Sequence, residues 1–280
     1  MSGKLYIVST PIGNLGDFSP RARSTLEAVD FIAAEDTRVG AKLLAHFDIK
    51  KPQISYFEHN RREKGDYIAR RIAEGESCAL ITDAGTPAVS DPGCDLVALC
   101  AERDVEVVSV PGCCAAIAAL SVAGMECGRF TFEGFLSVNK KSRREHLDEL
   151  KTEKRTMVFY EAPHKLVATL RDMLAAWGDR HVALCREITK MHEEVRRTTL
   201  SAALAYYTQN APRGEFVLVI SGALICNEKP APDATFLLDE VSRLIENGFG
   251  LMQAVRTTAT QYSVSKNALY RMAAERFGTQ

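Results

Sequence analysis

The stretch LYIVSTPIGNLGD, residues 5–17, runs from a short apolar segment straight into a loop of glycine, proline and polar residues. Short β-branched runs are typical of buried strands, and glycine and proline mark their ends. The same pattern recurs in the first half of the chain, with apolar runs at residues 31–35, 78–82 and 105–110. Amphipathic segments lie between these runs, so the pattern predicts strand–helix–strand units that form a parallel sheet covered on both faces.

The pattern restarts after Gly124. Further strand-like runs lie at residues 130–136, Thr156–Glu161, 181–187 and 215–221. Helical segments at residues 142–153 and Pro163–Trp177 separate them, and this alternation predicts a second α/β domain.

A segment rich in proline and polar residues, 227–233, follows and predicts a linker. Beyond it the sequence predicts only helices, at residues Ala234–Glu246, 251–262 and 265–277. The last two helices, joined by a tight turn at Ser263-Val264, resemble a helix-turn-helix. We therefore predict an α/β fold with three domains: an N-terminal α/β domain (1–118), a second α/β domain (119–226) and a small helical domain (227–280).

The composition excludes several classes of protein. Hydrophobic residues make up 46% of the 280 residues and charged residues 25%, with a formal net charge of −1, the balance of an ordinary globular protein. No apolar run approaches the roughly 18 residues that a transmembrane helix needs, and the N-terminus lacks the pattern of a signal peptide. The eight cysteines are scattered without a C-x-x-C pair, which favours free thiols in a reducing cytoplasm. We expect a cytoplasmic protein without a metal centre.

Three loops in the first half are rich in glycine and proline: residues 10–17, 83–93 and 111–115. In open parallel sheets, ligands bind beyond the carboxyl ends of the strands, so these loops should converge on one site. The first loop has G-x-x-G rather than G-x-G-x-x-G and lacks a P-loop lysine, which argues against NAD and ATP. Asp83, at a strand end, could accept hydrogen bonds from a ribose or an amine; alternatively, it only caps the following turn.

Six motifs, in order, closely resemble the ribosomal RNA small subunit methyltransferase I family of the tetrapyrrole methylase superfamily. They are LYIVSTPIGNLGD (5–17), AAEDTR (33–38), DAGTPAVSDPG (83–93), FEGFL (132–136), YEAPHK (160–165) and REITK (186–190). The resemblance runs from Leu5 to about Gly222 and continues more loosely into the terminal helices. Cys113-Cys114 departs from the small or hydroxyl residues that are common after that Pro-Gly.

The resemblance implies two α/β domains of the tetrapyrrole methylase type with S-adenosyl-L-methionine in the cleft between them. It also implies methylation of the 2′-hydroxyl of a cytidine ribose near the decoding site of 16S ribosomal RNA. Relatives of this fold commonly pair, so we expect a homodimer. Carried over by motif, the cofactor contacts would be Pro11, Asp83, Gly85, Thr86, Val89, Ser90, Ala115, Tyr160, Pro163, Glu215 and Phe216.

A ribose hydroxyl is a poor acid, so its methylation benefits from a base or from a charge that stabilises the forming alkoxide. Polar residues end several predicted strands. We expect Asp36 or Glu35, together with Lys190, to act near the acceptor ribose. Arg38 and His59 would then hold RNA phosphate or ribose. The alternative for each of them is a helix cap or an ion pair between domains.

A cluster of basic residues opens the helix after FEGFL, at the rim of the predicted cleft: Lys140, Lys141, Arg143 and Arg144. Such residues bind RNA phosphates without reading sequence, although a solvated helix face is the simpler alternative. The terminal helices, also locally basic, would dock on ribosomal RNA in the same way.

Two other functions remain open: methylation of a small cyclic tetrapyrrole, and regulation by a helix-turn-helix protein that senses a nucleotide-like ligand. The basic rim and the terminal helices favour RNA over the tetrapyrrole. Two full α/β domains with polar strand ends exceed what a sensor needs.

Overall fold

The computed structural model describes residues 3–91, 93–223, 233–262 and 264–278. The chain divides into two compact units, residues 1–223 and 224–280. Except for Asp233, the predicted linker lies outside the described residues.

The first sheet is parallel throughout, as predicted, and has the strand order β3-β2-β4-β1-β5. Its strands are β1 (Lys4–Val8), β2 (Phe31–Ala34), β3 (Gln53–Ser55), β4 (Cys78–Ile81) and β5 (Glu106–Val110). In this order the carboxyl ends of β3, β2 and β4 lie side by side, because Ala34 pairs with both Ser55 and Ile81.

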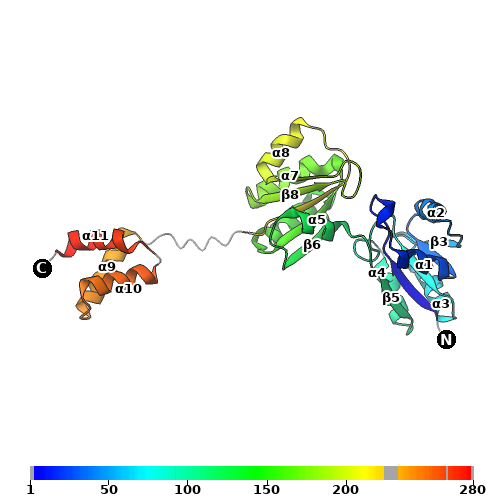
Figure 1. The fold of residues 1–280 in the computed structure, drawn as a ribbon, viewed down its shortest axis with the longest axis horizontal. Coiled ribbons are helices and arrows are strands. Elements are labelled where there is room, and N and C mark those ends of the chain that lie inside the picture. The colour runs from blue at the N-terminus through cyan, green and yellow to red at the C-terminus, as the bar shows by residue number, and fades with distance from the viewer. Residues whose placement is uncertain (1–2, 92, 224–232, 263, 279–280) are drawn as a thin grey trace. The chain divides into compact units, whose positions relative to one another are not determined.

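Helices cover both faces of this sheet (Figure 1). They are α1 (Pro20–Ala28), α2 (Thr37–His46), α3 (Arg61–Ala73) and α4 (Gly93–Ala101). The fully buried strand β2 explains the arrangement, since Ile32 packs with α1 and α2 while its neighbour Phe31 packs with α3 and α4. Alternate residues of a strand face opposite sides of a sheet, so an uninterrupted apolar run needs a cover on each side.

The second sheet differs from the first, because only β6 and β7 run parallel and the other neighbours are antiparallel. Its order is β6 (Phe130–Phe135), β7 (Thr156–Glu161), β10 (Phe216–Ile220), β8 (His181–Arg186) and β9 (Glu194–Thr199). The sequence pattern did not predict β9 or the helix after it, α8 (Leu200–Gln209). The sequence of β9, EVRRTT, is polar because β9 is an edge strand that buries little.

One helix covers one face of this sheet and three cover the other. The single helix, α5 (Ala115–Ala123), packs on β7, β8 and β10. The other three are α6 (Lys140–Glu149), α7 (Pro163–Trp177) and α8. The predicted domain boundary at 118/119 therefore falls inside α5, a helix that packs on the second sheet. The division into three domains stays a prediction.

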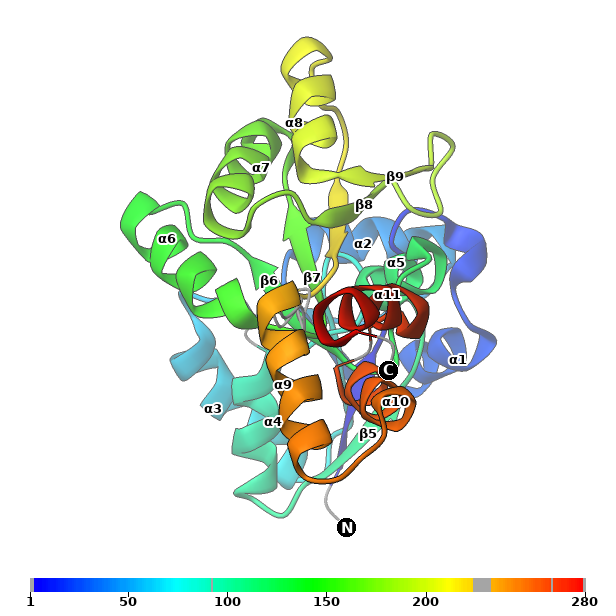
Figure 2. The ribbon, with the colours of Figure 1, turned by 90° about the vertical axis from the view of Figure 1, so that its left-hand side faces the viewer.

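The second unit consists of α9 (Ala234–Glu246), α10 (Leu251–Gln261) and α11 (Lys266–Phe277), which pack on one another (Figure 2). Their bounds match the predicted helices to within one residue. Across the described ranges, we find no helix long and apolar enough to cross a membrane.

Candidate functional site

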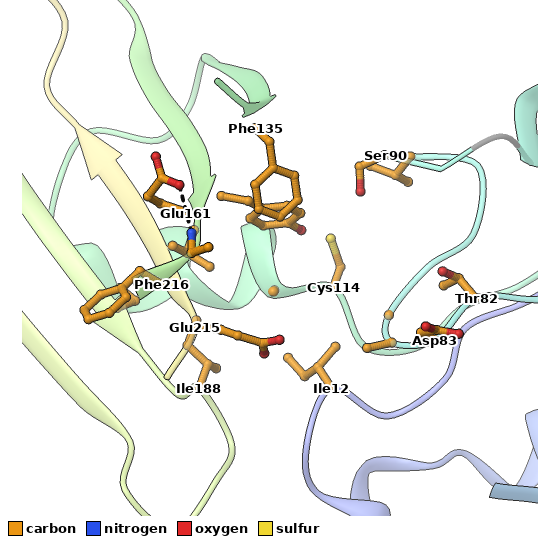
Figure 3. Close-up of a pocket in the computed structure, with 18 of the residues that line it drawn as sticks. Ile12, Thr82, Asp83, Ser90, Cys114, Phe135, Glu161, Ile188, Glu215 and Phe216 are labelled. Atoms are coloured by element: carbon orange, nitrogen blue, oxygen red, sulfur yellow. Dashed lines mark hydrogen bonds between the residues drawn. The ribbon is translucent and has the colours of Figure 1, made fainter. Parts of the chain in front are cut away.

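A cavity of about 600 Å³ lies at the carboxyl end of the first sheet and is closed on its other side by the second sheet (Figure 3). Its lining includes every predicted cofactor residue except Pro11: Asp83, Gly85, Thr86, Val89, Ser90, Ala115, Tyr160, Pro163, Glu215 and Phe216. Pro11 is buried, and its neighbour Ile12 lines the cavity instead. Small-molecule sites commonly have volumes of about 300–1,000 Å³.

The three glycine-rich loops converge, as expected, because hydrogen bonds join them. The backbones of Thr10 and Gly85 bond to each other, with N···O distances of 2.9 and 3.1 Å. The hydroxyls of Ser9 and Thr86 lie 2.9 Å apart, and Thr86 Oγ1 donates to the Cys113 carbonyl at 3.0 Å. Gly85 has a φ of +85°, which a side chain would strain. The floor of the cavity is therefore formed by three loops that hydrogen bonds hold together.

Two carboxylates join the ends of β2 and β4. Glu35 Oε2 accepts from Thr82 Oγ1 at 2.5 Å and from the Asp83 backbone at 3.4 Å. Asp83 Oδ1 in turn accepts from the Asp36 backbone at 3.1 Å. Burial, and then the charge of Glu35, raise the pKa of Asp83. Glu35 and Asp83 both line the cavity, so they present negative charge to a ligand there.

Asp36 and Arg38 lie beside the cavity but not on its lining. Asp36 caps α2, since its Oδ1 accepts from the Arg38 backbone at 2.8 Å, and its Oδ2 accepts from Arg38 Nη2 at 2.6 Å. The side-chain hydrogen bond from Arg38 lowers the pKa of Asp36 to about 2. The helix-cap alternative therefore accounts for Asp36, and a role for it as a base is a poor fit. His59 is also off the cavity, exposed after β3.

Lys190 reaches the cavity from the second domain. Its Nζ donates to Glu187 Oε1 at 3.0 Å and to Glu215 Oε2 at 2.9 Å. Burial acts against the charge of Lys190, but the hydrogen bonds to Glu215 and Glu187 outweigh it and raise the pKa of Lys190. A Cβ on Gly13 would lie 2.4 Å from Lys190 Cγ, so the lysine stem packs directly on the first loop. Lys190 is thus a protonated side chain that two carboxylates fix in place where the two α/β domains meet.

Tyr160 and Glu161 end β7 at the cavity wall. The Tyr160 hydroxyl accepts from the Ala116 backbone at 3.2 Å, and burial raises the pKa of Tyr160 to about 12. Glu161 is buried and accepts from the Ala162 backbone at 2.8 Å and from Thr169 Oγ1 at 2.5 Å. These bonds fix the start of α7, whose own N-cap residue, Ala162, has no capping side chain.

The other cavity residues were not among the site residues predicted from the sequence. They are Ile12, Thr82, Ala84, Asp91, Cys114, Phe135, Glu161, Ala162, His164, Cys185, Glu187, Ile188 and Val217. Most adjoin a predicted residue or stand in one of the six motifs, which is the signal that could have found them. Cys185 is an apolar strand residue that carries no such signal. Across the described ranges, we find no three His, Cys, Asp or Glu side chains grouped as a metal site.

The basic residues of α6 divide into two kinds. Lys140, Lys141 and Arg144 are exposed. Arg143 instead pairs with Asp172, with Nη2 and Oδ2 2.7 Å apart and both side chains less than a fifth exposed (16% and 18%). The expectation that Arg143 contacts RNA conflicts with this pairing, because a side chain that anchors α6 to α7 is not free to meet a phosphate.

Comparisons with known proteins agree with one another. The tetrapyrrole (corrin/porphyrin) methylase family matches residues 4–204. The chain is 47% identical over 274 residues to a ribosomal RNA small subunit methyltransferase I of Synechocystis sp., covering 98% of both chains. It is 42% identical to the protein of that name from Halalkalibacterium halodurans, over 96% of this chain and 94% of the other.

A solved structure shares the fold. Uroporphyrin-III C-methyl transferase of Thermus thermophilus, complexed with S-adenyl homocysteine, superposes with a TM-score of 0.56 over 78% of this chain and 97% of that chain. The two sequences are 16% identical, so this similarity concerns the fold alone.

Proposed function

The chain belongs to the ribosomal RNA small subunit methyltransferase I family of tetrapyrrole methylases, and from this premise we propose that it methylates the 2′-hydroxyl of a cytidine ribose near the decoding site of 16S ribosomal RNA, with S-adenosyl-L-methionine as the methyl donor. The observation that carries the proposal is the cavity between the two α/β domains. It gathers nearly all the cofactor residues expected from the motifs, in a chain that its relatives match along almost its whole length.

The residues of the cavity fit the cofactor. Ile12 and Tyr160 supply apolar walls for an adenine ring, whereas the Phe216 ring, 1% exposed, packs on Tyr207 in the core behind the lining. The Asp83 carboxylate is placed to accept hydrogen bonds from ribose hydroxyls or from an amine. Ala115, at the N-terminus of α5, lines the cavity, and the N-cap residue Cys114 makes no side-chain cap there. A helix start of this kind favours a carboxylate such as that of the methionine moiety.

The bound cofactor supplies a methyl group on a sulfonium, which is itself strongly electrophilic. The task of the protein is then to place the acceptor oxygen and to manage its proton. Lys190 stays protonated, so it stabilises the forming alkoxide by charge and does not act as the base. The Glu215 side chain, 81% exposed and bonded to Lys190, can accept the hydroxyl proton and pass it to water. Of the other candidates, Glu35 also lines the cavity. Arg38 and His59 lie outside the lining, where they would contact RNA that flanks the target nucleotide.

Methylation of a small tetrapyrrole is the competing function. The solved uroporphyrin methyl transferase shares the fold at only 16% identity, whereas the ribosomal RNA methyltransferases reach 47%. The exposed basic start of α6 and the terminal helical unit also have no use in binding a small macrocycle. The third alternative, a regulator that senses a nucleotide-like ligand, is disfavoured because the relatives of this chain are named as methyltransferases.

The test is to incubate the protein with labelled S-adenosylmethionine and either small ribosomal subunits or uroporphyrinogen III, and to map the label. We expect label on a single cytidine ribose of 16S RNA. Label on a base, or on the tetrapyrrole alone, would refute the proposal. We also propose that the protein acts in the cytoplasm, which cell fractionation checks, and that it is a homodimer, which sedimentation of the purified protein checks.

A further inference from the structure

The aromatic side chain of Phe135 is exposed to solvent and lines the cavity. It is 58% exposed, yet it belongs to the cavity lining, and Figure 3 shows its ring projecting toward the cavity from the end of β6. Its neighbour Leu136 is 5% exposed and belongs to the core. Single exposed hydrophobic residues are common on protein surfaces, but this ring is exposed on the lining of the cavity, where a ligand can cover it.

An irregularity in β6 directs this ring. The register of β6 against β7 shifts between Phe132 and Gly134, and Gly134 has a φ of +62°. In a regular strand, residues three apart point to opposite faces. Here the rings of Phe132 and Phe135 both contact that of Tyr160, at centroid distances of 5.1 and 5.5 Å. The bulge therefore turns Phe135 to the cavity side, which is a common use of bulges near functional sites.

The chain just after Phe135 offers phosphate contacts. Asn139 caps α6, its Oδ1 accepting from the backbones of Lys141 at 2.9 Å and Ser142 at 3.2 Å. The cap starts a helix whose exposed cations, Lys140, Lys141 and Arg144, follow within nine residues of Phe135. A planar ring beside a basic helix start suits a nucleotide whose base has left its stack.

We propose that Phe135 stacks on the base of the target nucleotide and so positions its ribose in the cavity, while the start of α6 holds the adjoining phosphates. This inference rests on the proposed function and adds the group that holds the acceptor. A 2′-hydroxyl reaches a methyl donor inside a cavity most easily when its nucleotide projects from the surrounding RNA, and sequence-specific RNA recognition commonly uses unstacked bases of this kind. Stacking on an aromatic ring offsets part of the cost of unstacking and tolerates any base.

The experiment uses the full-length protein saturated with S-adenosylhomocysteine and measures its Kd for small ribosomal subunits, and separately its Kd for S-adenosylhomocysteine. We expect Phe135→Ala to weaken subunit binding about tenfold and to leave S-adenosylhomocysteine binding unchanged, with Phe135→Trp restoring the affinity. Phe130→Ala is the matched control, because Phe130 lies on the same strand, is 37% exposed and is not part of the cavity lining. It should bind like the wild type.

Gly134→Ala provides a second variant that keeps the ring. No atom lies within 4 Å of the new Cβ, so only the positive φ is disfavoured, and the aim of Phe135 should change. We expect weaker subunit binding here too. Wild-type subunit affinity in Phe135→Ala, or a loss confined to S-adenosylhomocysteine, would overturn the inference. Failure of the wild-type protein to methylate any 16S ribose would instead refute the proposed function.

Discussion

The ammonium group of Lys190 lies 3.0 Å from Oε1 of Glu187, within a loop whose backbone is held in an unfavourable conformation. Glu187 and Thr189 have φ angles of +50° and +66°. Residues other than glycine, above all β-branched ones, rarely adopt this backbone region. Thr189 also donates to Asp17 in the first loop. Strain of this kind persists where surrounding contacts impose it, and it often accompanies functional sites.

Lys190→Met removes the charge while keeping an apolar stem over Gly13. If the ammonium stabilises the forming alkoxide, kcat for methylation of small ribosomal subunits should fall about 100-fold or more. The Kd for S-adenosylhomocysteine should not change, because the charge acts on the acceptor. Lys190→Arg, which retains the charge, is the control and should keep most activity. Equal turnover by Lys190→Met and the wild type would contradict the role.

The first sheet was predictable because each buried parallel strand is a continuous apolar run that ends in glycine, proline or a polar residue. The strand at residues 31–35 and the loop at 83–93 follow this pattern, so the position of the cavity floor followed from the sequence. The second sheet was harder. Its edge strand β9 buries little and resembles a polar loop, and nothing local distinguishes an antiparallel neighbour from a parallel one.

Side-chain pairing could not be predicted. Arg143 and Asp172 lie 29 residues apart in sequence and meet only because α6 packs on α7. The sequence shows Arg143 as one of four cations within five residues, with nothing to mark it as the one that turns inward. In contrast, the cap formed by Asp36 is local, and the helix-cap alternative for it was already visible in the sequence.

Asp83→Asn should weaken cofactor binding and should abolish the loss of cofactor affinity that the wild type shows as the pH falls. The folded-state pKa of Asp83 lies above its ordinary 3.8. Its contribution to folding is therefore fully present below pH 3.8 and is lost as the pH rises through the folded pKa, so the variant should be no less stable at neutral pH. Binding that needs the carboxylate runs the opposite way, and wild-type affinity should fall as the pH drops toward the raised pKa.

Calorimetry with S-adenosylhomocysteine at several pH values measures this effect. The Asn variant should bind at least about tenfold more weakly at about pH 7, since hydrogen bonds to a charged group contribute about 1.5–3 kcal/mol. Its affinity should be flat over the range where wild-type affinity declines. An acid decline that is unchanged in Asp83→Asn would assign the titration to another group.

Thr169→Val tests the support beneath the cavity wall. It removes the hydroxyl that donates to Glu161 Oε2 and leaves a buried carboxylate oxygen without that partner. The free energy of unfolding should fall by about 1–3 kcal/mol, as measured by urea denaturation. Thr208→Val is the control, because its hydroxyl bonds only locally to Leu204, four residues earlier on an exposed helix face. A decrease no larger than that of the control would mean that Glu161 finds another donor.

The basic residues of α6 should separate into RNA-binding and structural effects. Lys141→Glu and Arg144→Glu remove exposed charge, so each should weaken subunit binding and lower the slope of log Kd against log salt by about one for each phosphate that the side chain no longer neutralises. Stability should be unaffected. Arg143→Gln removes a charge close to both in the sequence, but it breaks a mostly buried ion pair, so it should reduce the free energy of unfolding by about 2 kcal/mol.

Titrating each variant with subunits over a range of salt concentrations, alongside urea denaturation, distinguishes the two effects. The charge change in Arg143→Gln is smaller than in the Glu variants, so Lys141→Gln and Arg144→Gln complete the comparison at equal charge. If those two weaken subunit binding while Arg143→Gln weakens only folding, the rim that serves the RNA consists of the outward-facing cations. If all three lower RNA affinity equally at full stability, Arg143 leaves Asp172 when RNA binds and the pairing is a resting state.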